Sequence, residues 1–258
     1  MKWWAAALFA LLLLYLLTLG ALYLFQRKIL FHPTHERRPR EGFFLESPEG
    51  KVRIEVRNSG KAKALIYFPG NSEHWWEDPD DLARLLPEHT IYFPHYPGYG
   101  ASEGSPSQEA FFAMAERLYD RIAPRHKSVD LAGRSLGSGV ALYLAVRRPV
   151  RRIVLITPYD SIASLGAERY PFFPVRSIVK DPFESIRYAP DIDVPVLILL
   201  AENDRVIPLA HTQNLIRHFQ RTEPRTILLP GTDHGNIIEH PDYPTALRRF
   251  LEEPAPQE

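Results

Sequence analysis

The residues best suited to chemistry lie in a short motif at Gly133–Gly137, with the sequence GRSLG. The apolar segment VDLA precedes it and LGSGVALYLAVR follows it, the strand–turn–helix context in which a G-x-S-x-G serine is exposed as a nucleophile. The tight turn predicts a strained backbone at Ser135, and the flanking glycines allow strand and helix to approach closely. The N–H of Leu136 would then lie at a helix N-terminus, where it can donate to an oxyanion. The structural alternative is a helix-capping serine with small neighbours.

A serine hydroxyl is a weak nucleophile unless a base and an acid assist it. Asp204 follows the apolar run VLILL, and His234 follows the run TILLP. Because the carboxyl ends of parallel strands meet at one edge of a sheet, these residues can converge on Ser135. The sequence therefore predicts Ser135 as nucleophile, His234 as general base and Asp204 as the supporting acid. The nearby carboxylates of Glu202 and Asp233 are interpreted as surface or turn residues.

The loop at residues 68–72, with the sequence FPGNS, follows the apolar run ALIYF. Gly70 permits a tight turn, and the N–H of Asn71 could point into the site. We expect the backbone N–H groups of Asn71 and Leu136 to form an oxyanion hole. An ordinary Pro-Gly turn is the alternative interpretation.

Composition excludes several other kinds of site. The 258 residues contain 31 Lys+Arg and 31 Asp+Glu, a balance that argues against a nucleic-acid binder. Cysteine is absent, which excludes disulfides, cysteine-ligated zinc and a thiol nucleophile. No H-E-x-x-H motif occurs, and the glycines after Pro97 have the wrong spacing for a dinucleotide fingerprint. We therefore predict no metal and no cofactor.

The hydrophobic pattern of the sequence predicts the strands and helices that must position these residues. Nearly continuous apolar runs predict strands buried on both faces of a mostly parallel sheet, and amphipathic stretches between them predict flanking helices. The fold class is thus α/β, with an eight-stranded sheet. The predicted strands are Phe43–Leu45, Val52–Val56, Ala64–Phe68, Ile91–Phe93, Val129–Ala132, Ile153–Ile156, Val196–Leu200 and Thr226–Leu229, the first two forming a hairpin. The predicted helices are Asp80–Leu86, Gln108–Ile122, Leu136–Arg147, Leu209–Gln220 and Pro241–Leu251.

The N-terminal segment from Trp3 to Phe25 carries no charge. As a helix it would be about 34 Å long, enough for a bilayer core of about 30 Å. We predict a single-pass transmembrane anchor, residues 1–27, with a cleaved signal peptide as the alternative. More basic residues follow the span than precede it, which favours a cytoplasmic catalytic domain, although long domains can be exported despite such charges.

The connection between the sixth and seventh predicted strands is unusually long and rich in aromatic residues and proline. We expect residues 158–193 to form a short lid insertion, because loops of this length are often functional. Tyr170, Phe172 and Phe173 are predicted to contact an apolar acyl or lipid-like substrate. The catalytic domain is predicted to cover residues 28–251, with a frayed tail at 252–258.

Together these motifs resemble the α/β-hydrolase superfamily and, within it, the membrane-anchored serine hydrolases of the Bem46/ABHD13/ABHD17 type. The matching segments are KILFHP (28–33), FPGN (68–71), YPGYGASEGSPS (96–107), GRSLGSGVA (133–141), NDRVIP (203–208) and HGN (234–236). The resemblance implies an α/β-hydrolase fold and the triad Ser135, Asp204 and His234. It also implies that Tyr96 and Tyr99 lie in a loop bordering the site, where we expect them to bind substrate.

The expected activity is hydrolysis of carboxylic esters or thioesters through an acyl-enzyme. Aminopeptidase-like or acyltransferase activity would use the same triad. A different class remains open: a non-catalytic, membrane-tethered binding protein on a hydrolase scaffold. We expect a monomer whose partners are its substrate and the membrane.

Overall fold

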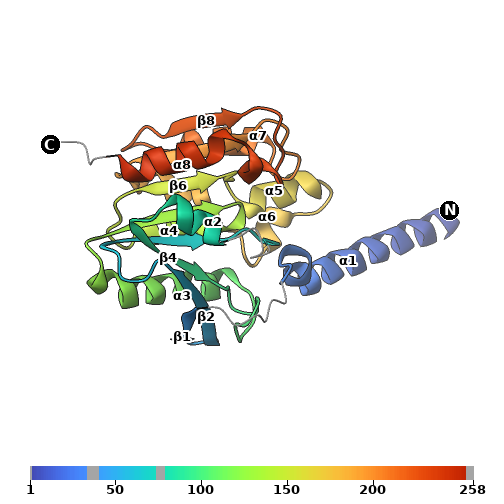
Figure 1. The fold of residues 1–258 in the computed structure, drawn as a ribbon. Coiled ribbons are helices and arrows are strands. Elements are labelled where there is room, and N and C mark those ends of the chain that lie inside the picture. Colours follow the sequence, from blue (N-terminus) through green and yellow to red (C-terminus); the bar gives the residue numbers. More distant parts are fainter. Residues whose placement is uncertain (1, 34–40, 74–78, 254–258) are drawn as a thin grey trace.

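The computed structural model describes residues 2–33, 41–73 and 79–253. A single sheet of eight strands forms its centre, in the order β1-β2-β4-β3-β5-β6-β7-β8 (Figure 1). The strands β1 and β2 pair antiparallel, β2 pairs antiparallel with β4, and all the other pairs are parallel. The bounds are β1 Gly42–Ser47, β2 Gly50–Arg57, β3 Lys63–Phe68, β4 His89–Pro94, β5 Ser128–Arg134, β6 Ile153–Ile156, β7 Val196–Ala201 and β8 Arg225–Leu229. All eight strands predicted from the sequence, and the opening hairpin, are confirmed.

Helices cover both faces of the sheet, as the doubly buried strands require. One hydrophobic core includes apolar residues of α3 (Gln108–Ile122), α4 (Leu136–Ala145) and α7 (Leu209–Ile216). A second core includes residues of α2 (Pro79–Leu85) and α8 (Asp242–Glu252). The α/β fold class with a mostly parallel sheet is thus confirmed, and the observed helices begin and end close to the predicted positions.

Helix α1 (Lys2–Leu30) projects from the domain (Figure 1). Among the described residues, it is the helix long and apolar enough to cross a membrane, with a mean hydropathy of 2.4 over an 18-residue window within Trp3–Leu30. The helix continues to Leu30, three residues past the predicted end of the anchor at residue 27. Phe31 then enters the core, where its ring lies 5.3 Å from that of Phe111. The predicted boundary between anchor and domain therefore falls inside a continuous helix.

The long β6–β7 connection folds into α5 (Ile162–Arg169), α6 (Val175–Ile178), η2 (Ser185–Arg187) and η3 (Ala189–Asp191). Its second half is fixed to the domain, because Phe183, Ala189 and Ile192 are buried in the core with α3 and α4. The first half, with α5 and α6, lies beside the domain end of α1 (Figure 1). Its movement as a lid stays a prediction. Most of the predicted C-terminal tail, residues 254–258, lies outside the described residues.

Candidate active site

The turn between β5 and α4 holds Ser135 in the strained conformation expected from the motif. Its φ is 49° and its ψ is −117°, values that non-glycine residues rarely adopt. The flanking glycines are needed for packing: a Cβ on Gly133 would lie 2.4 Å from the Gly137 oxygen, and one on Gly137 would lie 2.1 Å from the Phe68 oxygen. Strand, turn and helix therefore approach more closely than any side chain would allow, and the serine stands at the turn between them.

Ser135, His234 and Asp204 form a continuous chain of hydrogen bonds. His234 Nε2 lies 2.9 Å from Ser135 Oγ, and His234 Nδ1 lies 2.7 Å from Asp204 Oδ2. A proton on Nδ1 directed at the carboxylate leaves Nε2 free to accept the serine proton. The Asp204 side chain is only 3% exposed and that of His234 18%. The three residues predicted as a triad are thus brought together.

The loop after β7 orients the carboxylate of Asp204. Its Oδ1 accepts hydrogen bonds from the N–H groups of Val206 (2.9 Å) and Ile207 (2.8 Å), so Oδ2 is left to face His234. These two bonds hold the carboxylate in one orientation. The acid can therefore stabilise an imidazolium without moving.

The two carboxylates near the triad have structural roles, as the sequence indicated. Asp233 Oδ1 accepts hydrogen bonds from the N–H groups of Gly235 and Asn236, which lower the pKa of this exposed side chain. Glu202 Oε2 accepts a hydrogen bond from the Gly231 N–H at 2.8 Å. Both therefore stabilise turns.

The loop after β3 lies directly beside Ser135. A Cβ on Gly70 would lie 3.6 Å from the Ser135 Cβ. Within the described part of the chain, nothing accepts a hydrogen bond from the N–H of Asn71 or of Leu136. Both groups are therefore available to an oxyanion formed at Ser135.

The side chain of Asn71 ties this loop to neighbouring elements. Its Nδ2 donates to the Leu30 oxygen at 2.6 Å, and its Oδ1 accepts from the His32 N–H at 3.1 Å. The Tyr99 hydroxyl donates to the same Oδ1 at 2.7 Å. The C-terminal end of α1 is consequently bonded to the loop expected to form the oxyanion hole.

The structure corrects the expectation that Tyr96 and Tyr99 contact substrate. Both side chains are buried in the core, where the Tyr96 ring stacks on Phe111 at 4.1 Å. The Tyr96 hydroxyl donates to the Pro69 oxygen at 2.9 Å. Burial raises the pKa of both tyrosines well above the usual value, so they remain neutral donors. The sequence marked them as neighbours of the site, but they support the loop from behind.

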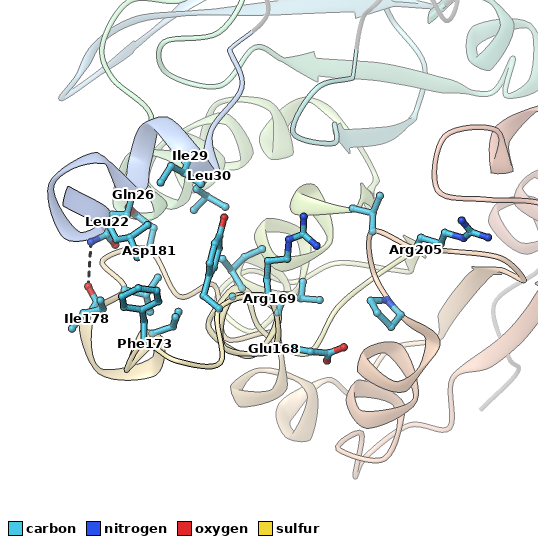
Figure 2. Close-up of a pocket in the computed structure, with 18 residues that line it drawn as sticks. Leu22, Gln26, Ile29, Leu30, Glu168, Arg169, Phe173, Ile178, Asp181 and Arg205 are labelled. Atoms are coloured by element: carbon cyan, nitrogen blue, oxygen red, sulfur yellow. Dashed lines mark hydrogen bonds between the residues drawn. The ribbon is translucent and has the colours of Figure 1, made fainter. Parts of the chain in front are cut away.

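The aromatic residues predicted in the β6–β7 connection lie in different environments. Tyr170 and Phe173 line a cavity of about 720 Å³ between this connection and α1 (Figure 2). Phe172 does not line it and is 85% exposed. The cavity also reaches Arg205, Val206 and Pro208, which follow Asp204, whereas Ser135 and His234 are not among its lining residues.

Sequence reasoning missed a buried ion pair that connects the loops of the site. Arg134 Nη2 donates to the backbone oxygens of His234 (3.1 Å) and Gly235 (2.9 Å). Its Nη1 lies 3.4 Å from Glu73 Oε1, while Glu73 Oε2 accepts from the Gly70 N–H at 2.5 Å. The ion pair of Arg134 and Glu73 thus holds the loop of His234 and the loop of Gly70 together. Arg134 fills the variable position before the serine, where the motif gives no signal.

Acidic and histidine side chains do not gather into a metal-binding group anywhere in residues 2–33, 41–73 and 79–253.

Comparisons with known proteins agree with this architecture. Residues 68–177 match a family described as "alpha/beta hydrolase fold". The zebrafish (Danio rerio) protein named Lysophosphatidylserine lipase ABHD12 is 34% identical over 228 residues, covering 74% of this chain and 59% of that protein. An uncharacterized protein of Mycobacterium tuberculosis is 33% identical over 167 residues, covering 62% of this chain and 59% of the relative. The chain thus spans less than two thirds of the length of these relatives.

Solved structures share the fold at low sequence identity. The esterase Pf2001 of Pyrococcus furiosus superposes with a TM-score of 0.67 at 14% identity, covering 86% of this chain and 98% of that one.

Proposed function

This chain belongs to the α/β-hydrolase superfamily, and we propose that it is a membrane-anchored serine hydrolase that cleaves carboxylic ester or thioester bonds. The observation that carries the proposal is the hydrogen-bond chain from Asp204 through His234 to Ser135, with distances of 2.7 and 2.9 Å. Such a chain supplies an activated nucleophile, a base and a fixed acid, which acyl transfer to a serine requires.

In the acylation step, His234 Nε2 accepts the proton of Ser135 while Oγ attacks the substrate carbonyl carbon. The negative charge on the carbonyl oxygen is stabilised by the N–H groups of Asn71 and Leu136. Asp204 stabilises the imidazolium of His234, which then donates its proton to the leaving alcohol or thiol. The product of this step is an ester between the acyl group and Ser135.

In the deacylation step, water attacks the acyl-enzyme. His234 removes the water proton and returns a proton to Ser135 Oγ as the acid product departs. The same two N–H groups stabilise the second tetrahedral intermediate. The cycle uses only groups of this chain, the substrate and water.

The substrate class that we propose is an ester or thioester of an apolar acyl group. The cavity beside Val206 is lined mainly by apolar side chains of α1 and of the β6–β7 connection. The zebrafish relative carries the name of a lipase, which agrees with such a substrate.

We place the catalytic domain in the cytoplasm, because Arg27 and Lys28 at the end of α1 favour that side under the positive-inside rule. A C-terminal green fluorescent protein fusion tests this topology in a bacterial host. Fluorescence supports the cytoplasmic placement, whereas activity of a C-terminal alkaline phosphatase fusion contradicts it.

A fluorophosphonate probe tests the serine mechanism on the full chain in detergent or bilayer discs. We expect labelling of the wild type and loss of labelling in Ser135→Ala. The matched control is Ser177→Ala, which removes an exposed serine on α6 and should keep the label. An unlabelled wild type that is folded would contradict the proposal and favour a non-catalytic binding protein.

A further inference from the structure

The β6–β7 connection contacts α1 along much of its length, well into the apolar span. The Tyr15 hydroxyl donates to the Phe172 oxygen at 3.1 Å, and the Tyr15 ring stacks on Phe173 with 5.4 Å between centroids. Nearer the domain, Gln26 donates to the Ile178 oxygen, as the dashed line in Figure 2 shows. Residues 172–178 therefore lie along the side of the helix.

The polarity of these contacts changes along α1. At the domain end, Arg27 forms a two-bond ion pair with the buried carboxylate of Asp181, and Gln26 Oε1 accepts from the Lys180 N–H at 2.6 Å. Toward the N-terminus, the contacts are the stacking of the Tyr15 ring on Phe173 and the single hydrogen bond from the Tyr15 hydroxyl. This order matches the passage from a polar membrane interface into hydrocarbon.

The position of Tyr15 sets the depth of the connection. It lies twelve residues before Arg27, or about 18 Å along the helix, whereas half of a bilayer core is about 15 Å. With Arg27 at the interface, Tyr15 and the Phe173 ring stacked on it lie at about the bilayer midplane when α1 is upright, and a tilt of α1 moves them toward the interface and into the near leaflet. The 85% exposure of Phe172 is then contact with lipid rather than with water.

Much of the backbone of this segment is paired, which lowers the cost of placing it in lipid, where unpaired polar groups are costly. Pro171 and Pro174 have no N–H. Five backbone N–H groups in this segment donate to backbone oxygens of the connection itself: those of Tyr170, Phe173, Val175, Ser177 and Val179. Arg176 is the one charged residue between Tyr170 and Val179, and its long side chain can reach the interface.

The cavity of about 720 Å³ connects this membrane-facing region with the catalytic domain, within the size range of about 300–1,000 Å³ typical of ligand sites. Its wall runs from Leu22 and Ile29 of α1 to Arg205 and Val206, next to Asp204 (Figure 2). One end therefore lies at the apolar span and the other beside the triad acid. Asn71, bonded to Leu30, holds α1 and the oxyanion loop in a fixed relation.

We propose that residues 170–179 insert into the near leaflet and that this cavity takes the long acyl chain of a substrate directly from the bilayer, with α1 as one wall. The proposal rests on the proposed function for the cleavage of that substrate. Helix α1 is then part of the binding site and not only a tether. The ester end of the substrate lies toward Val206, and the chain extends toward Leu22.

The first test measures chain-length selectivity of the full protein in bilayer discs, as the ratio of kcat/KM for a palmitoyl ester to that for an acetyl ester. Ile29→Trp places a larger side chain in the cavity wall. We expect it to lower the ratio by about tenfold, because a partly blocked pocket forfeits the apolar burial of about two methylenes. The matched control is Leu24→Trp, on the same helix but outside the cavity, which should leave the ratio unchanged.

The two proposals fail in distinguishable ways. Hydrolysis of both esters that persists in Ser135→Ala would overturn the serine mechanism. Ser135-dependent hydrolysis with the same ratio in Ile29→Trp and wild type would overturn the acyl-chain site alone.

The second test needs no activity. Because the chain has no cysteine, Phe172→Cys gives a single site for an environment-sensitive fluorophore. In bilayer discs we expect quenching by lipids brominated on their acyl chains and protection from aqueous iodide. The matched control, Phe44→Cys on β1, should show the reverse. Iodide quenching of the label at position 172 equal to that at position 44 would overturn membrane insertion.

Discussion

Replacing Arg134 with methionine should weaken both catalysis and folding, although Arg134 does not contact the reacting atoms. The substitution keeps the apolar stem and removes the guanidinium that joins His234, Gly235 and Glu73. The side chains of Arg134 and Glu73 are only 8% and 10% exposed, so water replaces the lost contacts poorly.

The expected cost follows from these contacts. Each hydrogen bond from a charged donor contributes about 1.5–3 kcal/mol, and a buried carboxylate left without its cation costs about 3–5 kcal/mol. These terms overlap, and Glu73 keeps its bonds to Tyr67 and Gly70, so we expect a loss of about 3 kcal/mol in the free energy of unfolding. A shift of His234 by about 1 Å would lower kcat by about 100-fold.

The assay combines urea unfolding with ester hydrolysis at saturating substrate. The matched control is Arg148→Met, which breaks a half-exposed ion pair with Glu116 and Asp120 away from the site. It should cost about 1 kcal/mol or less and leave kcat unchanged.

A double variant, Arg134→Met with Glu73→Gln, separates the ion pair from the other contacts of Arg134. Because it removes both charges, it should be more stable than the sum of the single losses by about 1 kcal/mol or more. A kcat within twofold of wild type in Arg134→Met, or strictly additive stability losses, would refute the role assigned to this pair.

Three further outcomes follow from the structure. Gly137→Ala should abolish activity and lower the melting temperature, because its Cβ would lie 2.1 Å from the Phe68 oxygen; wild-type values for both would contradict the packing described. Asp204→Asn should lower kcat by about 10⁴-fold at pH 7 with little change in KM, and an unchanged kcat would exclude it as the triad acid. At His211, burial lowers the pKa, but hydrogen bonds that the ring donates to the carboxylates of Asp160 and Glu168 outweigh burial, so the pKa is raised. The stability that the protonated His211 ring contributes is fully present below about pH 6.5 and is lost as the pH rises through the raised pKa. The variant His211→Gln should therefore lose more free energy of unfolding at about pH 6 than at about pH 9. Equal losses at the two pH values would contradict this.

Much of the fold could be predicted because each strand carries its own signal. Runs such as Ile153–Ile156 and Val196–Ala201 are apolar throughout, as strands covered on both faces must be. The positions of Ser135, Asp204 and His234 were predictable for a related reason, since each follows a recognisable strand at its carboxyl end.

Other features depend on contacts between distant residues, for which the sequence has no local signal. Glu73 and Arg134 are separated in the chain by α2, β4, α3 and η1, and neither lies in a sequence pattern that indicates its partner. Tyr96 and Tyr99 lie in a glycine-containing loop for which the sequence predicts exposure, yet the Tyr96 ring stacks on Phe111, the Tyr99 ring packs edge-on against it, and both are buried. Helix α1 passes the predicted boundary because Leu30 and Phe31 pack against the domain.

The most direct test of the central claim is the mass of the protein during turnover. The full chain is mixed with a slowly hydrolysed ester, quenched in acid and analysed as intact protein and as peptides. We predict an added acyl mass on the peptide that contains Ser135, and its absence in Ser135→Ala. An acyl group on another residue, or wild-type hydrolysis by Ser135→Ala, would contradict the account.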